Sequence, residues 1–452
     1  MTCFQISEHG RLPIGDPPQC SNDDPPRQIP AQLAARFVAA VQGAGFRGAP
    51  VLEIRGRNLR AGGVVGVVVA GDHSLEILPK IDTPGLTDHA AVQTAIRTRL
   101  VHMLEVARKL KIAPGPQADL GLQRHTVLEI LIRVFCDRLS VAVRRGMPRA
   151  YVAREDDLPS VRGRLDMVRQ FTRHAANPSR LACRFDDLSS DIALNRIMKA
   201  AIEHLIRMAR SPANQQRLRE LAFVYADIAS IPIPALPWGN VVLDRTSHAW
   251  REIIVMAEMF LRQQHQTTSQ GDVHGTALLF DMSALFEEYV GQLVRQALAG
   301  TGLRVSLQGG HRYCLKARER ELFQTRPDIL IQDGARTIHV IDTKWKHINQ
   351  PGDHPKHGVS QADVYQMMAY AHLYNAPRLT LLYPHHVGLA KKDGRQASFC
   401  IACSGATLEV ATIEVPDRPG MNECVQRLQS QIRLPQGGAD LVNALSEQMN
   451  AK

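Results

Sequence analysis

A short stretch with three prolines, Ile231 to Pro237, constrains the fold of this chain more than any other segment. Proline lacks an amide hydrogen and restricts the residue before it, so a helix cannot continue through this stretch. The chain has 452 residues, more than one hydrophobic core usually supports, and two or three domains are expected. We therefore predict a boundary here, between an N-terminal domain over residues 31–240 and a C-terminal domain over residues 241–452.

The N-terminal domain is expected to mix strands and helices. Residues 63–81 hold β-branched side chains before and after Gly71, which predicts a β-hairpin with its turn at that glycine. Residues 1–30 contain six prolines among polar residues, and we predict a flexible tail because so little apolar surface cannot offset the entropy of ordering. Apolar residues spaced three and four apart predict helices over about residues 88–111, 126–145 and 192–210.

The charge of the chain suits a polyanionic partner. Lys and Arg number 54 against 44 Asp and Glu, an excess of ten, and this balance fits nucleic acid as well as it fits an ordinary basic protein. The longest apolar run, over residues 62–71, is half of the ~20 residues that a membrane helix needs. The N-terminus also lacks the basic start and apolar stretch of a signal peptide. We therefore expect a cytoplasmic protein that does not contact a membrane.

Two predicted strands of the C-terminal domain carry two carboxylates and a lysine. The segments on either side of Gly334 favour extended structure, and this glycine favours a tight turn between them. Alternate residues of a strand share a face, so Asp342 and Lys344 are expected to point together while Thr343 points away. Asp328, at the end of the preceding strand, can reach the same place. The pattern therefore predicts that two carboxylates and one ammonium group converge.

This combination of groups suits the hydrolysis of a phosphodiester bond. Carboxylate oxygens hold Mg²⁺, which stabilises charge on the phosphate and acidifies a water molecule. Lys344 would orient that water or help to deprotonate it. An isolated Asp-x-Lys is more often an exposed pair worth less than ~1 kcal/mol. Here the Pro-Asp sequence at Asp328 and the fourteen-residue interval to Asp342 favour a catalytic role.

Two predicted helices flank this pair of strands. One begins at Ser360, because an acidic residue follows at the spacing of a capping box. Gln366 and Tyr370 are four residues apart in this helix and share a face. The other helix lies upstream and carries Glu287 and Glu288 on opposite flanks of an apolar stripe. Spacing alone does not decide which of these two glutamates faces the site.

The order and spacing of these motifs resemble McrC, the nuclease component of modification-dependent restriction systems. The resemblance extends over roughly residues 50–390. The similar segments are residues 75–81, 161–165, 186–189, Asn195, 281–290, 326–328, 341–344 and 363–371.

The resemblance implies a multidomain α+β or α/β protein with a partner-binding N-terminal region. Its C-terminal domain would have the PD-(D/E)-x-K nuclease fold, a mixed central sheet flanked by helices. The family's catalytic carboxylates fall on Asp328 and Asp342, its lysine on Lys344 and its helix glutamate on Glu287, with Gln366 and Tyr370 in the flanking helix. The implied Mg²⁺ ligands are Asp328, Asp342, Glu287 and the backbone carbonyl of Thr343.

The resemblance also implies a partner, the AAA+ motor McrB, which hydrolyses GTP and recognises and translocates double-stranded DNA containing 5-methylcytosine. McrC contacts the McrB ring through its N-terminal half, stimulates GTP hydrolysis and cuts the DNA. The chain has no G-x-x-x-x-G-K-[ST] phosphate loop, so GTP is expected to bind the partner and not this chain.

Two other functions are compatible with parts of this pattern. A non-catalytic scaffold that activates a partner NTPase would need the N-terminal half, but it would not need Asp328, Asp342 and Lys344 together. A free-standing DNA repair nuclease of the same fold would need these three residues, but it would not need the long N-terminal half to cut DNA. A restriction endonuclease that works with a motor uses both parts of the chain.

Overall fold

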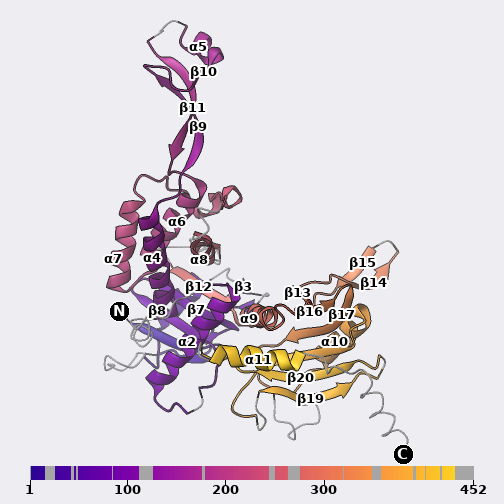
Figure 1. Cartoon of the computed structure of the whole chain (residues 1–452). Helices are drawn as coiled ribbons and strands as arrows, with labels where there is room; N and C mark the ends of the chain where they lie inside the picture. The colour runs from indigo at the N-terminus through magenta and orange to yellow at the C-terminus, as the bar shows by residue number, and fades with distance from the viewer. Residues whose placement is uncertain are drawn as a thin grey trace, which may run out of the picture.

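The computed structural model describes residues 2–15, 26–41, 45–46, 49–83, 85–110, 126–175, 179–243, 250–262, 275–318, 320–348, 358–389, 393–402, 404–417 and 420–432. Two main sheets with their covering helices lie next to each other, and a long hairpin arm projects from the N-terminal part (Figure 1). The predicted fold class, a mixed protein of strands and helices, is confirmed at this level.

A four-stranded sheet organises the N-terminal part. In spatial order its strands are β1 (Cys3–Ser7), β8 (His73–Leu78), β7 (Val64–Ala70) and β12 (Gly275–Asp281). β7 and β8 form the predicted hairpin, and Gly71 has a φ of +57°, which glycine adopts without steric cost. All residues of β7 are buried, because successive side chains enter two hydrophobic clusters on opposite faces of the sheet.

The first strand corrects the expectation that residues 1–30 are a flexible tail. β1 pairs in parallel with β8, and its alternate residues Phe4 and Ile6 are 2% and 5% exposed. The polar, proline-rich composition of the whole segment hid this short apolar alternation, and β8 supplies the backbone partners that order it. Pro17, Pro18 and Pro25 lie outside the described residues.

A small layer of short strands and one helix completes the N-terminal core. Phe37 and Leu59 are fully buried in this second cluster, and the Phe37 ring lies edge-on to the Phe4 ring with the centroids 6.4 Å apart. The layer consists of β2 (Arg11–Pro13), α1 (Ala31–Ala40), β3 (Gly45–Phe46), β4 (Ala49–Pro50), β5 (Leu52–Arg55) and β6 (Asn58–Ala61).

A group of helices packs on the four-stranded sheet. The three predicted helices are confirmed as α2, α4 and α6, and the first two begin where the side chains of Asp88 and Thr126 accept backbone hydrogen bonds. The group comprises α2 (His89–Ala107), α4 (Val127–Arg145), α6 (Ala193–Met208), α7 (Pro212–Val224) and α8 (Arg251–Arg262), with the short turns η1 (Ile233–Ala235) and η2 (Trp238–Asn240).

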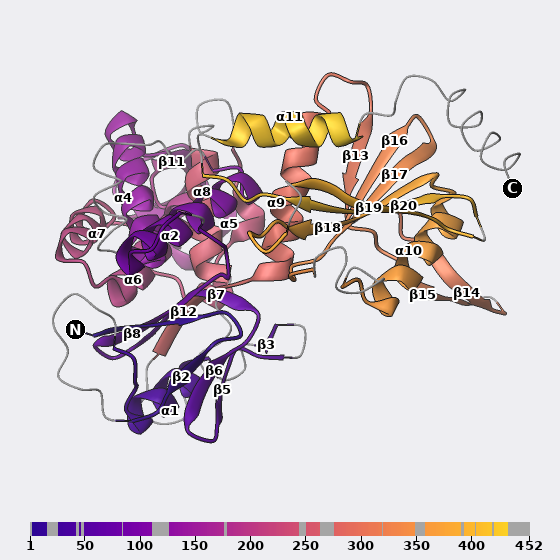
Figure 2. The ribbon, with the colours of Figure 1, turned by 90° about the horizontal axis from the view of Figure 1, so that it is seen from below.

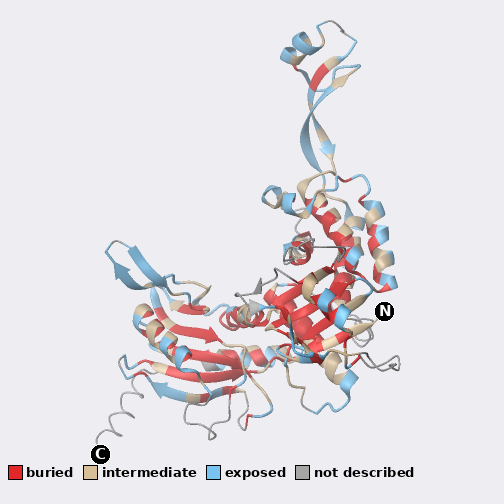
Figure 3. Cartoon of the chain, turned by 180° about the vertical axis from the view of Figure 1, so that it is seen from behind, coloured by how far each residue is buried: buried red, intermediate tan, exposed pale blue. Residues whose placement is uncertain are grey.

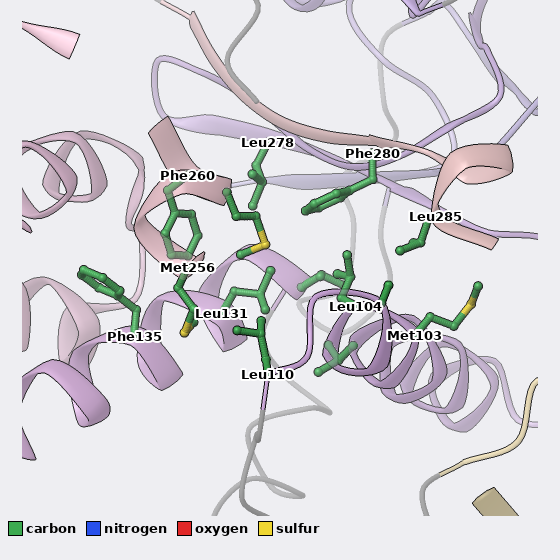
Figure 4. Close-up of a cluster of buried hydrophobic side chains, with 14 of the residues drawn as sticks. Met103, Leu104, Leu110, Leu131, Phe135, Met256, Phe260, Leu278, Phe280 and Leu285 are labelled. Atoms are coloured by element: carbon green, nitrogen blue, oxygen red, sulfur yellow. The ribbon is translucent and has the colours of Figure 1, made fainter. Parts of the chain in front are cut away.

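The proline stretch interrupts the helices but does not divide the core at residue 240. β12, which follows the stretch, pairs antiparallel with β7, which precedes it. Figure 4 shows side chains of α2 and α4 packed with side chains of α8 and β12, namely Leu104, Leu131, Phe135, Met256, Phe260, Leu278 and Phe280. The expected boundary is therefore displaced toward the end of β12, because prolines remove backbone hydrogen bonds without deciding which side chains share a core.

The sequence patterns did not predict the hairpin arm. It consists of β9 (Ala150–Leu158), β10 (Arg164–Leu165), α5 (Met167–Arg173) and β11 (Leu181–Ser189). β9 and β11 pair antiparallel along their whole length and carry the tip away from the helices (Figure 1). The first seven residues of β9 are exposed, and Figure 3 shows that most of the arm is exposed.

The second main sheet has six strands. Its spatial order is β13 (Arg304–Leu307), β16 (Ile329–Asp333), β17 (Arg336–Thr343), β18 (Arg378–Pro384), β20 (Thr407–Ile413) and β19 (Gly394–Cys400). β17, β18 and β20 are mutually parallel, whereas the other neighbours are antiparallel. β16 and β17 form the predicted pair of strands, with Gly334 at a φ of +57° in the turn between them.

Helices cover both faces of this sheet. Figure 2 shows α11 (Met421–Ile432) on one side of the sheet and α10 (Gln361–Tyr374) on the other. α9 (Met282–Ala297) packs beside α11 and joins the two main sheets, since it follows directly from β12. A separate two-stranded hairpin, β14 (Tyr313–Ala317) and β15 (Arg320–Gln324), extends beyond the sheet (Figure 1). In the described ranges, each helix is too short or too polar to span a membrane.

Candidate active site

Asp328 and Asp342 come from neighbouring antiparallel strands. Ile329 pairs with Ile341, so the next residues outward, Asp328 and Asp342, lie across from each other where β16 begins and β17 approaches its end. Residues directly opposite on antiparallel strands point to the same face, and like charges in that position repel. The structure thus brings together the two carboxylates that strand alternation predicted.

Asp342 is in an environment that opposes its negative charge. Its side chain is 1% exposed. Burial, and then the negative charge of Asp328, raise the pKa of Asp342 from its ordinary value of 3.8 to about 7, although Lys344 acts in the opposite direction. A carboxylate with this pKa gains a full charge near neutral pH only when additional positive charge is close to it.

Lys344 supplies part of that positive charge. Its Nζ lies 2.5 Å from Asp342 Oδ2, which agrees with the prediction that these two side chains point together. The backbone amide of Lys344 donates to the carbonyl of Leu382 at 2.9 Å and so continues the β17–β18 pairing past Thr343. The lysine therefore projects from an extended and hydrogen-bonded backbone, which limits its possible positions.

Thr343 holds the second carboxylate. Its backbone amide and its hydroxyl each donate to Asp328 Oδ2 at 2.7 Å. The expectation that Thr343 points away from the site is thus wrong for its hydroxyl. Asp328 lies just before β16, so the alternation of side chains along that strand does not fix its direction. Its carboxylate can therefore accept from both the amide and the hydroxyl of Thr343. One oxygen of Asp328 is fixed in this way, beside Asp342.

The helix α10 supports Lys344 from the other side. Ser360 caps this helix as predicted, with its hydroxyl accepting from the Asp363 amide at 3.2 Å. Lys344 Nζ donates to Gln366 Oε1 at 3.1 Å, and Gln366 Nε2 donates to the Tyr370 hydroxyl at 2.8 Å. Burial, followed by the negative charge of Asp342, raises the pKa of Tyr370, so this hydroxyl stays neutral. Gln366 and Tyr370 therefore form a chain of hydrogen bonds ending at the lysine.

The structure distinguishes Glu287 from Glu288. Glu287 accepts from Gln308 Nε2 at 2.7 Å, and the backbone amide of Gln308 donates to the Asp328 carbonyl at 2.8 Å. Glu288 faces Arg108 of α2 at 3.4 Å, and burial raises its pKa. Glu287 is thus the glutamate that is linked to the backbone of Asp328, through Gln308.

The two residues that follow Lys344 make contacts that the sequence patterns did not predict. Lys346 forms an ion pair with Asp363 at the start of α10. Trp345 donates from Nε1 to Glu8 Oε1 at 2.8 Å, and its ring centroid lies 5.1 Å from that of Phe286. Glu8 follows β1 and is 2% exposed, so the N-terminal sheet contacts the residue next to Lys344. Residues 337 positions apart in sequence carry no local pattern that predicts this contact.

The site fits a divalent metal ion in its donor chemistry. Asp328 and Asp342 offer hard carboxylate oxygens, and the high pKa of Asp342 arises from burial and from the neighbouring carboxylate, both of which a cation would offset. Across the residues that the structure describes, no cluster of three or more His, Cys, Asp or Glu side chains is arranged for a metal. Mg²⁺ suits such a pair, because it binds through one or two carboxylates and retains several waters.

The fold is similar to that of a known restriction complex. A chain of the Thermococcus gammatolerans half-complex of McrB AAA+ hexamers with bound McrC matches with a TM-score of 0.68 and 16% identity, covering 96% of this chain and 100% of that one. A chain of the T. gammatolerans McrBC complex has a TM-score of 0.49 and 20% identity, covering 66% of this chain and 88% of that one. Among curated proteins, none matches the sequence.

The fold and the sequence together define a component of a restriction system. Residues 59–384, well over half of the chain, match the family described as McrBC 5-methylcytosine restriction system component. The chain belongs to this family.

Proposed function

We propose that the chain is the DNA endonuclease subunit of a 5-methylcytosine-dependent restriction system and cuts phosphodiester bonds with Mg²⁺. The observation that carries this proposal is the buried Asp342 opposite the partly buried Asp328 and beside Lys344, with the pKa of Asp342 raised to about 7. In this proposal β16, β17 and the parallel strands after them, covered by α9, α10 and α11, are the core of a PD-(D/E)-x-K domain.

Each side chain then has a distinct task. Asp328 and Asp342 hold the metal, with the backbone carbonyl of Thr343 as a further candidate ligand. When bound, Mg²⁺ stabilises charge on the scissile phosphate and acidifies a water molecule. Lys344, positioned by Gln366, orients the attacking water and offsets negative charge that develops on the phosphate. Tyr370 remains a neutral hydrogen-bonding group that fixes Gln366.

The N-terminal part is proposed to bind a McrB-like AAA+ ring that hydrolyses GTP. The chain is similar in fold to a chain from an assembly of McrB hexamers with bound McrC, which motivates this partner. The arm is the candidate contact, because it projects from the body and exposes apolar side chains at its tip. Val168 and Phe171 of α5 are 74% and 69% exposed, and such residues gain most from burial against another protein.

Cleavage by the reconstituted complex tests the catalytic proposal. With the ring, GTP, Mg²⁺ and methylated DNA, Asp342→Asn and Lys344→Ala should each lower the cleavage rate by ~10²-fold or more. Glu53→Gln, on β5 and outside the arm, is the control for removing one carboxylate charge and should retain cleavage. Undiminished cutting by both site variants, with the fold intact, would refute the assignment.

Binding to the ring tests the proposed partner independently. Replacing Val168 and Phe171 together by serine should abolish stimulation of GTP hydrolysis, while leaving metal binding at the Asp342 site unchanged. Phe223→Ser is the control, since Phe223 is 83% exposed at the end of α7 and lies outside the arm. Normal stimulation by the arm variant would place the ring contact elsewhere.

A further inference from the structure

The β14–β15 hairpin is a second projection, next to the candidate active site. The residues described from Cys314 to Gln324 are all exposed, and Figure 3 shows the hairpin extending beyond the sheet as an exposed ribbon. Three of its residues are large and apolar, Leu315, Leu322 and Phe323, with exposures of 56%, 40% and 71%. An isolated two-stranded hairpin is marginally stable in water, and these exposed apolar side chains do not stabilise it by burial. Exposed apolar side chains that gather in one place mark a site that binds another molecule.

Phe323 has an unfavourable backbone conformation. Its φ is +57°, in the left-handed region that bulky residues rarely adopt. The register of the hairpin skips this position, since Leu322 pairs with Leu315 and Gln324 pairs with Tyr313. The side chain is exposed, so burial does not compensate for the conformation. Strain of this kind is concentrated at sites that bind ligands.

The hairpin carries three basic and two acidic residues in the sequence. Lys316, Arg318 and Arg320 are exposed, and of the acidic residues Glu319 and Glu321, the second lies 3.6 Å from Lys316. Arg318 and Arg320 flank the tip. An arginine fork donates several hydrogen bonds and matches the geometry of a phosphate. Apolar side chains can pack against bases and basic side chains can bind phosphates, so this narrow ribbon carries groups suited to both parts of a nucleic acid.

The base of the hairpin is fastened to the candidate active site. The Tyr374 hydroxyl, at the end of α10, lies 2.9 Å from Thr325 Oγ1 and accepts from the Arg312 amide at 3.3 Å. Arg326 bonds Gln308, whose backbone amide donates to the carbonyl of Asp328. The hairpin therefore has a defined position relative to both the helix that holds Lys344 and the strand that begins after Asp328.

We propose that the β14–β15 hairpin grips the duplex DNA beside the bond that is cut. Arg318 and Arg320 bind phosphates away from the site, and Phe323, nearer the base of the ribbon, packs against base edges or an opened base step. Two-stranded ribbons fit the DNA grooves, and apolar side chains inserted from a groove unstack neighbouring bases. This inference depends on the proposed function, because it assumes that DNA reaches Asp328 and Asp342.

The test uses the full chain and a duplex that carries 2-aminopurine, with Ca²⁺ replacing Mg²⁺ so that binding is measured without cutting. Arg318→Ala with Arg320→Ala should weaken binding about tenfold and reduce the slope of log K against log salt by about two, since each phosphate contact contributes ~0.9. Phe323→Ala should weaken binding by about tenfold and lower the 2-aminopurine signal, with a smaller change in the salt slope. Phe223→Ala is the control for loss of an exposed phenylalanine.

The outcomes separate this inference from the proposed function. Wild-type chain that cuts DNA with its ring while all hairpin variants bind and cut normally would overturn the role of the hairpin alone. Hairpin variants that bind DNA normally but no longer bind the ring would show that the hairpin contacts the partner protein, and would also overturn its role in DNA binding. Wild-type complex that neither binds nor cuts DNA would overturn the proposed function itself.

Discussion

Carboxylates of the arm and of the candidate active site have opposite electrostatic environments. In the arm, Asp157 accepts from Arg169 and lies 3.0 Å from His174 Nε2. The His174 hydrogen bond is the largest cause that lowers the pKa of Asp157. In the site, Asp342 is buried opposite Asp328 with one nearby ammonium, and its pKa rises to about 7.

The difference shows what each region requires. In the arm, Arg169 pairs with Glu155 and Asp157, and Arg184 pairs with Glu155 and Asp166, so these carboxylates lie next to cations. The site has two carboxylates for Lys344, and burial makes that imbalance costly. A metal ion would correct it. The same residue type therefore serves the fold in one region and, in our proposal, metal binding in the other, according to burial and to the number of nearby cations.

The largest expected effect is on stability as a function of pH. Without divalent metal, folded Asp342 takes up a proton below pH about 7, whereas the unfolded chain does so near its ordinary value of 3.8. The folded state therefore binds more protons between these values, and its stability falls as pH rises from about 4 to about 7. Asp342→Asn should remove this loss, on the order of 2–4 kcal/mol, and raise the Tm at pH ~8 but not at pH ~4.

Asp157→Asn should change the melting temperature in the opposite direction, and it is the comparison for the Asp342→Asn experiment. The pKa of Asp157 is lowered, so its contribution to stability is present above the unfolded pKa and is lost as the pH falls. The variant should have a lower Tm than wild type at neutral pH, with the difference disappearing in acid. Thermal melts that show the same sign for both variants would contradict the contrast between the regions.

A smaller effect is expected for the hydrogen bonds on α10. Gln366→Ala removes the acceptor for Lys344 and the donor to Tyr370, and should lower the maximal cleavage rate by about tenfold with DNA affinity unchanged. Gln361→Ala is a matched control, because Gln361 bonds Tyr365 at the same spacing on an exposed part of the helix. Equal rates for the two variants would mean that Gln366 does not position the lysine.

The smallest effect is expected at the contact between the two sheets. Glu8→Gln keeps an oxygen that can accept from Trp345 but removes the charge, which should cost about 1 kcal/mol. The fluorescence of Trp345 should shift, and the cleavage rate should fall by less than about fivefold. Glu53→Gln, which affects an ion pair with exposed Arg55, serves as control. An unchanged spectrum would show that the bond to Glu8 does not restrain Trp345.

The elements that local patterns specify were predicted well. The strands β16 and β17 follow from apolar alternation around Gly334, and α10 follows from the cap at Ser360, so Asp342, Lys344, Gln366 and Tyr370 could be brought together from the sequence. Their catalytic and metal-binding roles stay predictions. Periodicity also identified α4 and α6, which each bury one apolar side, and α2, in which the five consecutive residues from Leu100 to Leu104 are all buried.

Contacts between distant segments could not be predicted in the same way. β1 is too short to stand out from a proline-rich segment, and it is ordered by β8 more than sixty residues later. The arm has few buried residues, so its strands lack the apolar alternation that identifies a half-buried strand. Whether Glu287 or Glu288 faces the site depended on the positions of Gln308 and Arg108, which local spacing does not encode.

Metal binding by the Asp328–Asp342 pair is the most direct test of the central claim. Mn²⁺ can replace Mg²⁺, and its binding to the full chain can be followed by electron paramagnetic resonance near neutral pH. Wild-type chain and Asp157→Asn should bind Mn²⁺ with similar affinity, whereas Asp342→Asn should lose this binding. Equal affinity in Asp342→Asn would contradict the claim that the carboxylates of Asp328 and Asp342 form the metal site.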